Sequence, residues 1–209
     1  MYKRQNNGNS DKTASLADYM ERKKEDQECI YYICAETYET ASRSPHLEIF
    51  KDKGVEVLLM FDRIDEWLMG SLSEFEGVPF VDVMRGDVKL PGEPKSEEDD
   101  EDSDAEEHPL TERIQAVIGD KVEGVRPSKR LTDSPACLVL SDYGMGIQMR
   151  KILEASGQSM PETKPFFEFN AEHPLLHRLD TEQDEDRFAE LVELLFDQAS
   201  LAEGGTLQD

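Results

Sequence analysis

The side chains of this sequence that could do chemistry are three cysteines and four histidines among many acids. Four residues separate Cys29 from Cys34, whereas a redox pair has two intervening residues, and Cys137 lies far along the chain. The odd number and the spacing match no metal-ligand pattern. The cysteines are therefore expected to be reduced thiols in a reducing compartment, the cytoplasm.

The histidines include one pair with a useful spacing. His173 and His177 are four residues apart, which can place two imidazoles on one face of a helix. Pro174 lies between them, however, and no third ligand or general base completes a zinc motif. His46 and His108 are isolated. We expect His173 and His177 to lie at helix ends or on the surface, and we expect no metal site.

Nucleotide and acid–base chemistry have no better candidates. Gly144 and Gly146 lack the remaining residues of a phosphate-binding loop. Carboxylate pairs occur throughout, but in a chain with 47 acidic residues they carry no specificity. The sequence therefore predicts no catalytic residue, and no cofactor is expected.

The net charge of the chain limits the kinds of partner that it can bind. The 47 acidic residues stand against 23 basic ones, and the net charge is −24. Duplex DNA and anionic membrane surfaces repel such a chain, so we expect no nucleic acid and no membrane as partner. No apolar run approaches the roughly 18 residues that span a bilayer, and the first residues lack the apolar stretch of a signal peptide.

Composition divides the chain into four regions. Residues 1–14 are polar without periodicity and are expected to be disordered. Residues 15–86 alternate short apolar runs with helical patterns, which predicts an α/β unit. Nine acids fill eleven positions in the run EEDDEDSDAEE, so residues 87–107 are expected to form an acidic linker. Residues 108–209 predict an α+β domain that ends in helices.

The first unit is expected to alternate helices and strands. Almost wholly apolar runs at residues 30–34 and 55–61 are typical of parallel strands buried on both faces. A helix is expected over residues 64–75, with one apolar stripe of Ile64, Leu68, Leu72 and Phe75. The other expected elements are a helix capped by Ser15, a helical stretch broken at Pro45 and ended at Gly54, and a strand over 80–83.

In the second region, two helices carry apolar patterns with more than one interpretation. Helices are expected over 109–118, 145–155, 174–179 and 184–203, and strands over 122–126, 136–140 and 166–169. The helix over 145–155 has an apolar stripe, which indicates either a core face or an adaptable surface for varied partners. This stripe consists of Met145, Met149, Ile152 and Leu153.

The last helix has apolar residues on two faces. Leu194 and Leu201 lie nearly opposite the main apolar face. Such a pattern predicts either a seam between subunits or a helix buried centrally in one domain. The main face consists of Phe188, Leu191, Val192, Leu195 and Ala199.

Several long runs resemble one known family, the 90-kDa heat-shock protein chaperones of the bacterial HtpG type. SPHLE (44–48), GVEVL (54–58) and DRIDEW (62–67) follow one another and resemble the end of that family's middle domain. RLTDSPACLV (130–139) and FAELVELLFDQASLAEGGTLQD (188–209) resemble its C-terminal domain. The resemblance covers about residues 15–86 and 108–209.

The resemblance implies a chaperone that binds unfolded or partly folded client proteins and forms a homodimer through its C-terminal helices. ATP and Mg bind a separate N-terminal domain in the family, and this domain is absent here, so the chain itself is expected not to be an enzyme. Family members also continue past a run like GTLQD into a last helix, so weaker dimerisation is expected. The residues at client-binding positions are Glu66, Trp67, Met145, Met149, Ile152 and Leu153. Those at the dimer interface are Leu191, Leu194, Leu195 and Leu201.

The residues alone leave two other functions open. The first unit could be a small thiol-redox or flavodoxin-like protein, although residues 35–37 contain no glycine and place Glu36 where a phosphate would bind. Alternatively, the acidic run could make the chain a scaffold that binds basic proteins, with strong dependence on salt.

Overall fold

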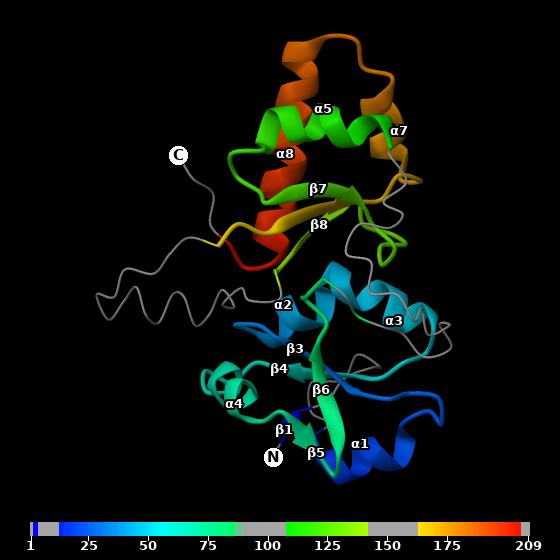
Figure 1. Cartoon of the computed structure of the whole chain (residues 1–209), viewed down its shortest axis with the longest axis vertical. Helices are drawn as coiled ribbons and strands as arrows, with labels where there is room; N and C mark the ends of the chain where they lie inside the picture. The colour runs from blue at the N-terminus through cyan, green and yellow to red at the C-terminus, as the bar shows by residue number, and fades with distance from the viewer. Residues whose placement is uncertain (1, 4–12, 87, 89–107, 142–162, 206–209) are drawn as a thin grey trace, which may run out of the picture.

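The structure of the protein is a computed structural model that describes residues 2–3, 13–86, 88, 108–141 and 163–205 (Figure 1). Two parts, each with its own sheet, lie one above the other in this view. We call residues 13–86 the N-terminal unit and the described residues of 108–205 the C-terminal unit. Both combine helices with strands, which confirms the mixed α/β content that the sequence predicts.

The N-terminal unit is built on a four-stranded sheet with the order β4-β3-β6-β5. The central strand β3 (Ile30–Cys34) is parallel to β4 (Val57–Met60) and to β6 (Val78–Asp82). Every side chain of β4 is buried, because apolar clusters lie on both faces of the sheet. The prediction of parallel strands buried on both faces is therefore confirmed.

Local sequence signals set the first helices. α1 (Leu16–Arg22) begins with a capping box, in which Ser15 and Asp18 each accept a hydrogen bond from the other's N–H group. The expected break at Pro45 is confirmed, since α2 (Tyr38–Arg43) is followed by the 3-10 helix η1 (Pro45–Leu47) and by α3 (Glu48–Asp52). Gly54 ends this stretch with a φ of 61°.

The helix expected over residues 64–75 is shorter than the sequence suggested. α4 spans Asp65–Ser71, and β5 (Glu74–Phe75) then forms an antiparallel hairpin with β6. The two turn residues, Glu76 and Gly77, have φ values of 52° and 79°, the left-handed pair that a two-residue hairpin turn requires. The expected apolar stripe is also wrong: Phe75 lies in a strand, and no residue of α4 is buried.

A further difference concerns residues 1–14. The structure pairs β1 (Tyr2–Lys3) with β2 (Thr13–Ala14) in antiparallel orientation, whereas this stretch was expected to be disordered. Each strand has only two residues, and so short a strand shows no apolar alternation that the sequence could reveal.

The C-terminal unit is built on a three-stranded sheet with the order β7-β9-β8. β7 (Gly124–Pro127) runs parallel to β9 (Phe166–Phe169), and β8 (Ala136–Val139) runs antiparallel to it. α5 (Pro109–Ile118) and α8 (Glu185–Ala202) cover one face of this sheet, as Figure 1 shows. The largest apolar cluster among the described residues lies beneath them, with Phe167, Phe169 and Phe188 fully buried.

Two helices of this unit begin in the same unusual way. α5 and α7 (Pro174–Asp180) each start with the pair His-Pro. The Nδ1 atoms of His108 and His173 accept hydrogen bonds from Leu110 N and Leu175 N, both at 3.2 Å, and so cap the two helices. The expectation of a histidine at a helix end is confirmed for His173, whereas the capping role of His108 was not predicted.

Two predicted regions lie outside the described residues. They are the acidic linker over 87–107, apart from Val88, and the helix over 145–155.

Candidate functional site

Exposed apolar side chains of the N-terminal unit gather at α4. Ile64, just before this helix, is 71% exposed, and Trp67 is 60% exposed. Glu66 is half-buried. Figure 1 shows α4 at one side of the unit. Glu66 and Trp67, the two expected client-binding residues of this unit, therefore belong to a surface helix that contributes no buried side chain to the core.

The other expected client-binding residues are Met145, Met149, Ile152 and Leu153. All four lie outside the described residues, so the structure does not place this stripe relative to Trp67.

α8 separates the four leucines of the expected dimer interface into two sets. Leu194 and Leu201 are 62% and 51% exposed, on the side of α8 that faces away from the sheet. Leu195 is buried in the cluster beneath the helix, and Leu191 packs against this cluster. Only Leu194 and Leu201 are therefore available, without rearrangement, for contact with another molecule.

Polar contacts join the two units, and we call this region the joint. It comprises contacts of Glu48 with residues 132–134, of Arg130 with residues 83–86, and of His46 with Leu138 and Glu203. A backbone hydrogen bond of 2.9 Å from Leu140 N to Met84 O completes it. No residue of the joint was predicted to have a role, although the runs SPHLE and RLTDSP that meet here carried part of the family resemblance.

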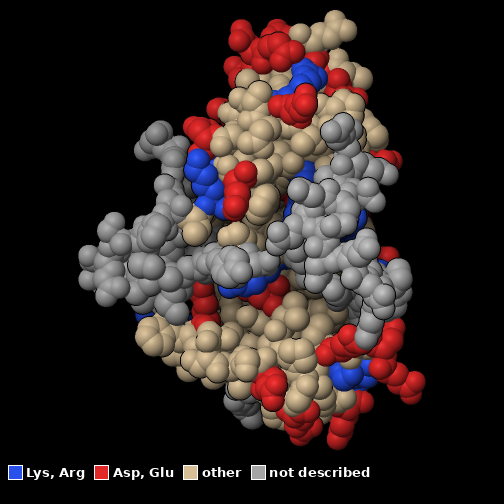
Figure 2. Space-filling model, viewed as in Figure 1, with Lys and Arg blue, Asp and Glu red and all other residues tan. Residues whose placement is uncertain are grey.

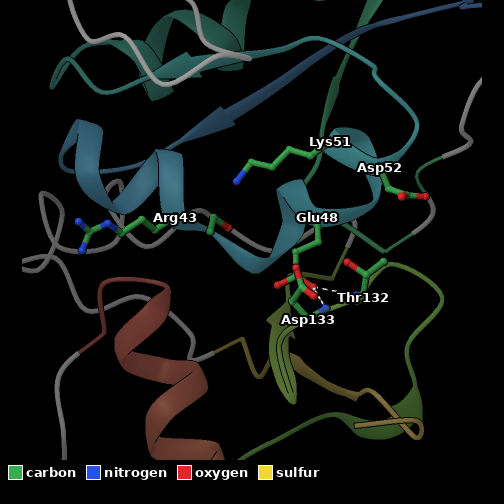
Figure 3. Close-up of a pocket in the computed structure, with 7 residues that line it drawn as sticks. Arg43, Glu48, Lys51, Asp52, Thr132 and Asp133 are labelled. Carbon is green, nitrogen blue, oxygen red and sulfur yellow. Dashed lines mark hydrogen bonds between the residues drawn. The ribbon is translucent and has the colours of Figure 1, made fainter.

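Glu48 reaches from α3 to a loop of the C-terminal unit (Figure 3). Its Oε2 accepts hydrogen bonds from the N–H groups of Thr132 and Asp133, both at 2.8 Å, and the Ser134 N–H lies 3.1 Å from each carboxylate oxygen. Burial alone would raise the pKa of Glu48, but the hydrogen bonds from Ser134, Asp133 and Thr132 outweigh burial and lower this pKa.

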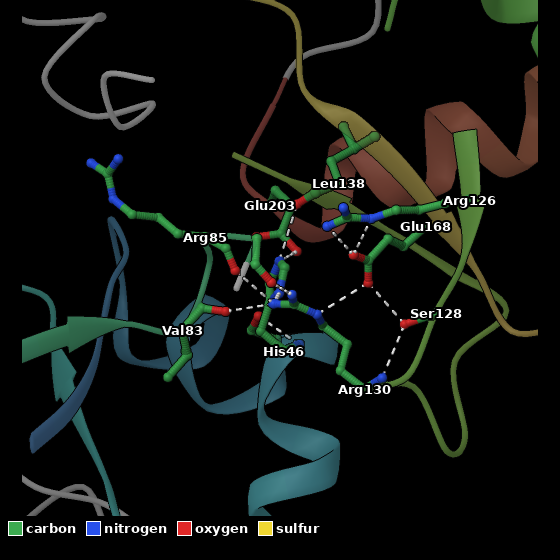
Figure 4. Close-up of polar contacts among 11 residues, drawn as sticks. His46, Val83, Arg85, Arg126, Ser128, Arg130, Leu138, Glu168 and Glu203 are labelled. Atoms are coloured by element: carbon green, nitrogen blue, oxygen red, sulfur yellow. Dashed lines mark hydrogen bonds and ion pairs between the residues drawn. The ribbon is translucent and has the colours of Figure 1, made fainter. Parts of the chain in front are cut away.

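Arg130 lies at the centre of the joint (Figure 4). Its Nη1 donates to the carbonyl oxygens of Val83 and Arg85, at 2.9 and 3.0 Å, and its Nη2 donates to the carbonyl of Gly86. Its Nε lies 3.1 Å from Glu168 Oε2. One guanidinium group therefore connects the end of β6 in the first unit to β9 in the second.

Glu168 is a buried carboxylate with several donors around it. It lies between Phe167 and Phe169 on β9, and because alternate side chains point to opposite faces, it points away from α5 and α8. Arg126 Nη2 lies 2.8 Å from its Oε1, and Ser128 Oγ donates to its Oε2 at 2.9 Å. Together with Arg130, these donors compensate a charge that would otherwise be costly to bury.

His46 fills the interior of the joint and is fully buried. Its Nε2 lies 3.1 Å from the Leu138 carbonyl oxygen and 3.2 Å from Glu203 Oε1. Within the part of the chain that the structure describes, Glu203 Oε1 is buried without a hydrogen-bond donor. Burial also raises the pKa of Asp82, at the end of β6, despite the hydrogen bond that Met84 N donates to it.

The pKa values of the three thiols are shifted in the direction opposite to the one that redox chemistry needs. Cys29, Cys34 and Cys137 are free thiols. Burial raises the pKa of all three. Nucleophilic cysteines need a lowered pKa, so the thiol-redox alternative gains no support.

The described residues offer little else for metal or membrane binding. No group of three or more His, Cys, Asp or Glu side chains within them could hold a metal ion. Nor does this part of the chain contain a helix that is long and apolar enough to cross a membrane. On the face in Figure 2, acidic side chains gather toward the two ends of the molecule, with several basic side chains near its middle.

Among the described residues, large apolar side chains are exposed at α4, α7 and α8. A family model described as Hsp90 protein matches residues 2–209. The chain therefore belongs to the Hsp90 family of chaperones. Proteins of this family are ATP-dependent stress-response chaperones that bind clients and dimerise.

Proposed function

We propose that this chain is the client-binding and dimer-forming part of a bacterial HtpG-type Hsp90 chaperone. The N-terminal unit would be the end of the middle domain, and the C-terminal unit the dimerisation domain. The preferred partners would be unfolded or partly folded proteins, and the free thiols fit a reducing compartment such as the cytoplasm.

The exposure of Trp67 carries the client-binding proposal. A tryptophan that is 60% exposed, next to Ile64 at 71%, leaves a large apolar area in water. α4 packs against the core through the partly buried Met69 and has no fully buried residue, so Trp67 is left on the solvent side of the helix. An extended client segment with apolar side chains would cover Trp67 and Ile64, and the half-buried Glu66 would favour basic residues in it.

A binding titration tests the proposal. The chain is added at physiological salt to a labelled, persistently unfolded protein, with the folded form of the same protein as control, and fluorescence anisotropy is measured. We expect preference for the unfolded form and at least a several-fold loss of affinity in Trp67→Ser. Leu175→Ser, which changes a leucine that is 44% exposed on α7, is the matched control. Equal binding of both forms would contradict client binding.

The stripe of Met145, Met149, Ile152 and Leu153 belongs to the same proposal. We expect Met145→Ser with Met149→Ser to weaken client binding while leaving unfolding cooperative. Loss of cooperative unfolding would instead assign the stripe to the core. In the intact chaperone, the nucleotide state would change how two protomers present this stripe and Trp67 to a client.

The exposed face of α8 supports the dimerisation proposal. Leu194 and Leu201 are seven residues apart, so they lie on one side of the helix, and both are more than half exposed. We expect the double variant Leu194→Glu with Leu201→Glu to weaken self-association more than tenfold in sedimentation equilibrium. Leu175→Glu provides a control with one added acid on another helix. An unchanged dimerisation constant would exclude this face.

Hydrolysis of ATP is proposed to belong to a domain outside this chain, because no run of the sequence has a nucleotide-binding pattern. The chain is therefore expected to have no ATPase activity above the buffer rate, and measurable turnover would contradict this part of the proposal.

A further inference from the structure

The loop of residues 132–134 has the geometry of an anion-binding site. Its three successive N–H groups converge on one carboxylate, with N···O distances of 2.8, 2.8 and 3.1 Å. Successive backbone N–H groups that point at one place form a nest, which binds oxyanions in many proteins. Here the anion belongs to the protein itself, since Glu48 arrives from the other unit.

The site is open to solvent on one side. A pocket of about 340 Å³ adjoins Glu48, and Arg43, Lys51, Asp52, Thr132 and Asp133 line it together with Ser44. Thr132 and Asp133 are exposed, and Glu48 is half-buried. Figure 3 shows the Glu48 carboxylate directed at the loop, with Lys51 on the opposite side of the pocket. A small anion could therefore reach the N–H groups if Glu48 moved away.

We propose that the N–H groups of Thr132, Asp133 and Ser134 form an oxyanion-binding site that Glu48 of the same chain occupies, and that small carboxylates bind there when Glu48 is absent. The carboxylate of Glu48 thus acts as an internal ligand that closes the joint. A tethered ligand has a high effective concentration, about millimolar or above, so dilute free anions do not displace it from the unaltered chain. The inference concerns the joint and does not depend on client binding.

Rescue by an added carboxylate tests the site. In Glu48→Ala, sodium acetate is titrated against sodium chloride at equal ionic strength, and the amide signals of residues 132–134 are followed by NMR. We expect these signals to shift in a saturable way with acetate only. The melting temperature, lowered by the substitution, should recover by about 2–4 °C. Signals that do not saturate, or that shift equally in chloride, would overturn the proposal.

Two variants keep the result specific. Asp52→Ala removes a carboxylate from the same pocket without touching the N–H groups, so acetate should leave its amide signals and melting temperature unchanged. Glu48→Gln keeps the shape of the side chain and lets its amide oxygen fill the site without charge. If Glu48→Ala does not fold, Glu48→Gln replaces it in the acetate titration. Acetate shifts in Glu48→Gln larger than those in the unaltered chain would agree with weak occupation by the neutral amide. Identical responses of all variants, the unaltered chain included, would overturn the proposal.

Discussion

The two sheets of this protein bury their faces by different means. In the N-terminal unit, both faces of the parallel strands carry apolar side chains, and β4 is buried at every position. In the C-terminal unit, the face under α5 and α8 is the larger apolar core, whereas the other face combines a small apolar cluster of Leu131, Cys137 and Val139 with Glu168 and its partners Arg126 and Arg130. That second face forms the joint. A sheet face can therefore be closed by compensated charges together with a small apolar cluster, as well as by a large hydrophobic core.

The largest loss of stability is expected from a substitution on the polar face of the C-terminal sheet. Arg130→Ala removes a donor from the buried Glu168 carboxylate and leaves three carbonyl groups of residues 83–86 without their donor. Removing one partner of a buried ion pair typically costs about 3–5 kcal/mol. We expect a loss of this size in the free energy of unfolding, measured with urea. Arg187→Ala, which removes an exposed arginine from its pair with the half-buried Glu182, is the control and should cost at most about 1 kcal/mol. If Arg130→Ala cost as little as is expected for Arg187→Ala, the joint would contribute little stability.

The next effect tests the apolar face of the same unit. Leu195 is buried beneath α8, whereas its neighbour Leu194 is 62% exposed. Leu195→Ala should lower the free energy of unfolding by about 2–5 kcal/mol, because it leaves a cavity in the core. Leu194→Ala should change that of the monomer by about 0.5 kcal/mol or less. Similar losses at the two positions, in denaturant titrations below the dimerisation concentration, would refute the division of α8 into a core face and a free face.

A smaller effect is expected at a buried hydroxyl of the N-terminal unit. The Tyr19 hydroxyl donates to the Glu56 carbonyl at 2.8 Å and accepts from Gln27 Nε2 and Tyr31 N, at 2.7 and 3.2 Å. Tyr19→Phe leaves these buried groups without their partner, which costs about 1–3 kcal/mol.

Alkaline pH tests the same hydroxyl. Burial raises the pKa of Tyr19 to about 12. The neutral phenol is therefore favoured in the folded state, and its contribution to stability is complete below the unfolded pKa of about 10. This contribution is lost as the pH rises from about 10 through 12. Tyr19→Phe should lose less stability over this range than the unaltered chain in equilibrium unfolding, and parallel profiles would argue against the assignment.

The smallest expected effect is the change in stability at low pH when Glu48 of the joint is replaced. The pKa of Glu48 is lowered in the folded state, so its contribution to stability is present above the unfolded pKa of about 4.3 and is lost as the pH falls through the folded value. In thermal melts between pH 7 and pH 3, Glu48→Gln should show a shallower acid decline than the unaltered chain. Asp52→Asn, whose carboxyl lines the same pocket, should leave the decline unchanged. A full acid decline in Glu48→Gln would remove Glu48 from the explanation.

The sequence predicted most of the individual elements, because their signals are local. The apolar run at Ile30–Cys34 is a strand with the expected bounds. The strand Phe166–Phe169 and the helix Pro109–Ile118 also have the bounds that the sequence predicted. The end of α4 was missed because the hairpin turn uses Glu76, a residue that is uncommon at positive φ, ahead of Gly77.

The joint could not be predicted in the same way. Glu48 and residues 132–134 are more than 80 residues apart, and no periodicity links them. In a chain with 47 acidic residues, nothing local separates the buried Glu168 from an exposed glutamate. For the proposed surfaces, the spacing of Leu194 and Leu201 correctly indicated a second apolar face, whereas the exposure of Trp67 was expected only from the family resemblance.

The position of the Leu140 side chain affects when the apolar cluster of the N-terminal unit becomes complete during synthesis. Although Leu140 follows β8 in the C-terminal unit, its side chain is buried in a cluster of the N-terminal unit with Val83 and Met84. During synthesis at about 5–20 residues per second, the last buried side chain of this cluster therefore arrives several seconds after the rest of the first unit. A nascent chain that ends before this residue lacks one of the buried side chains of this cluster.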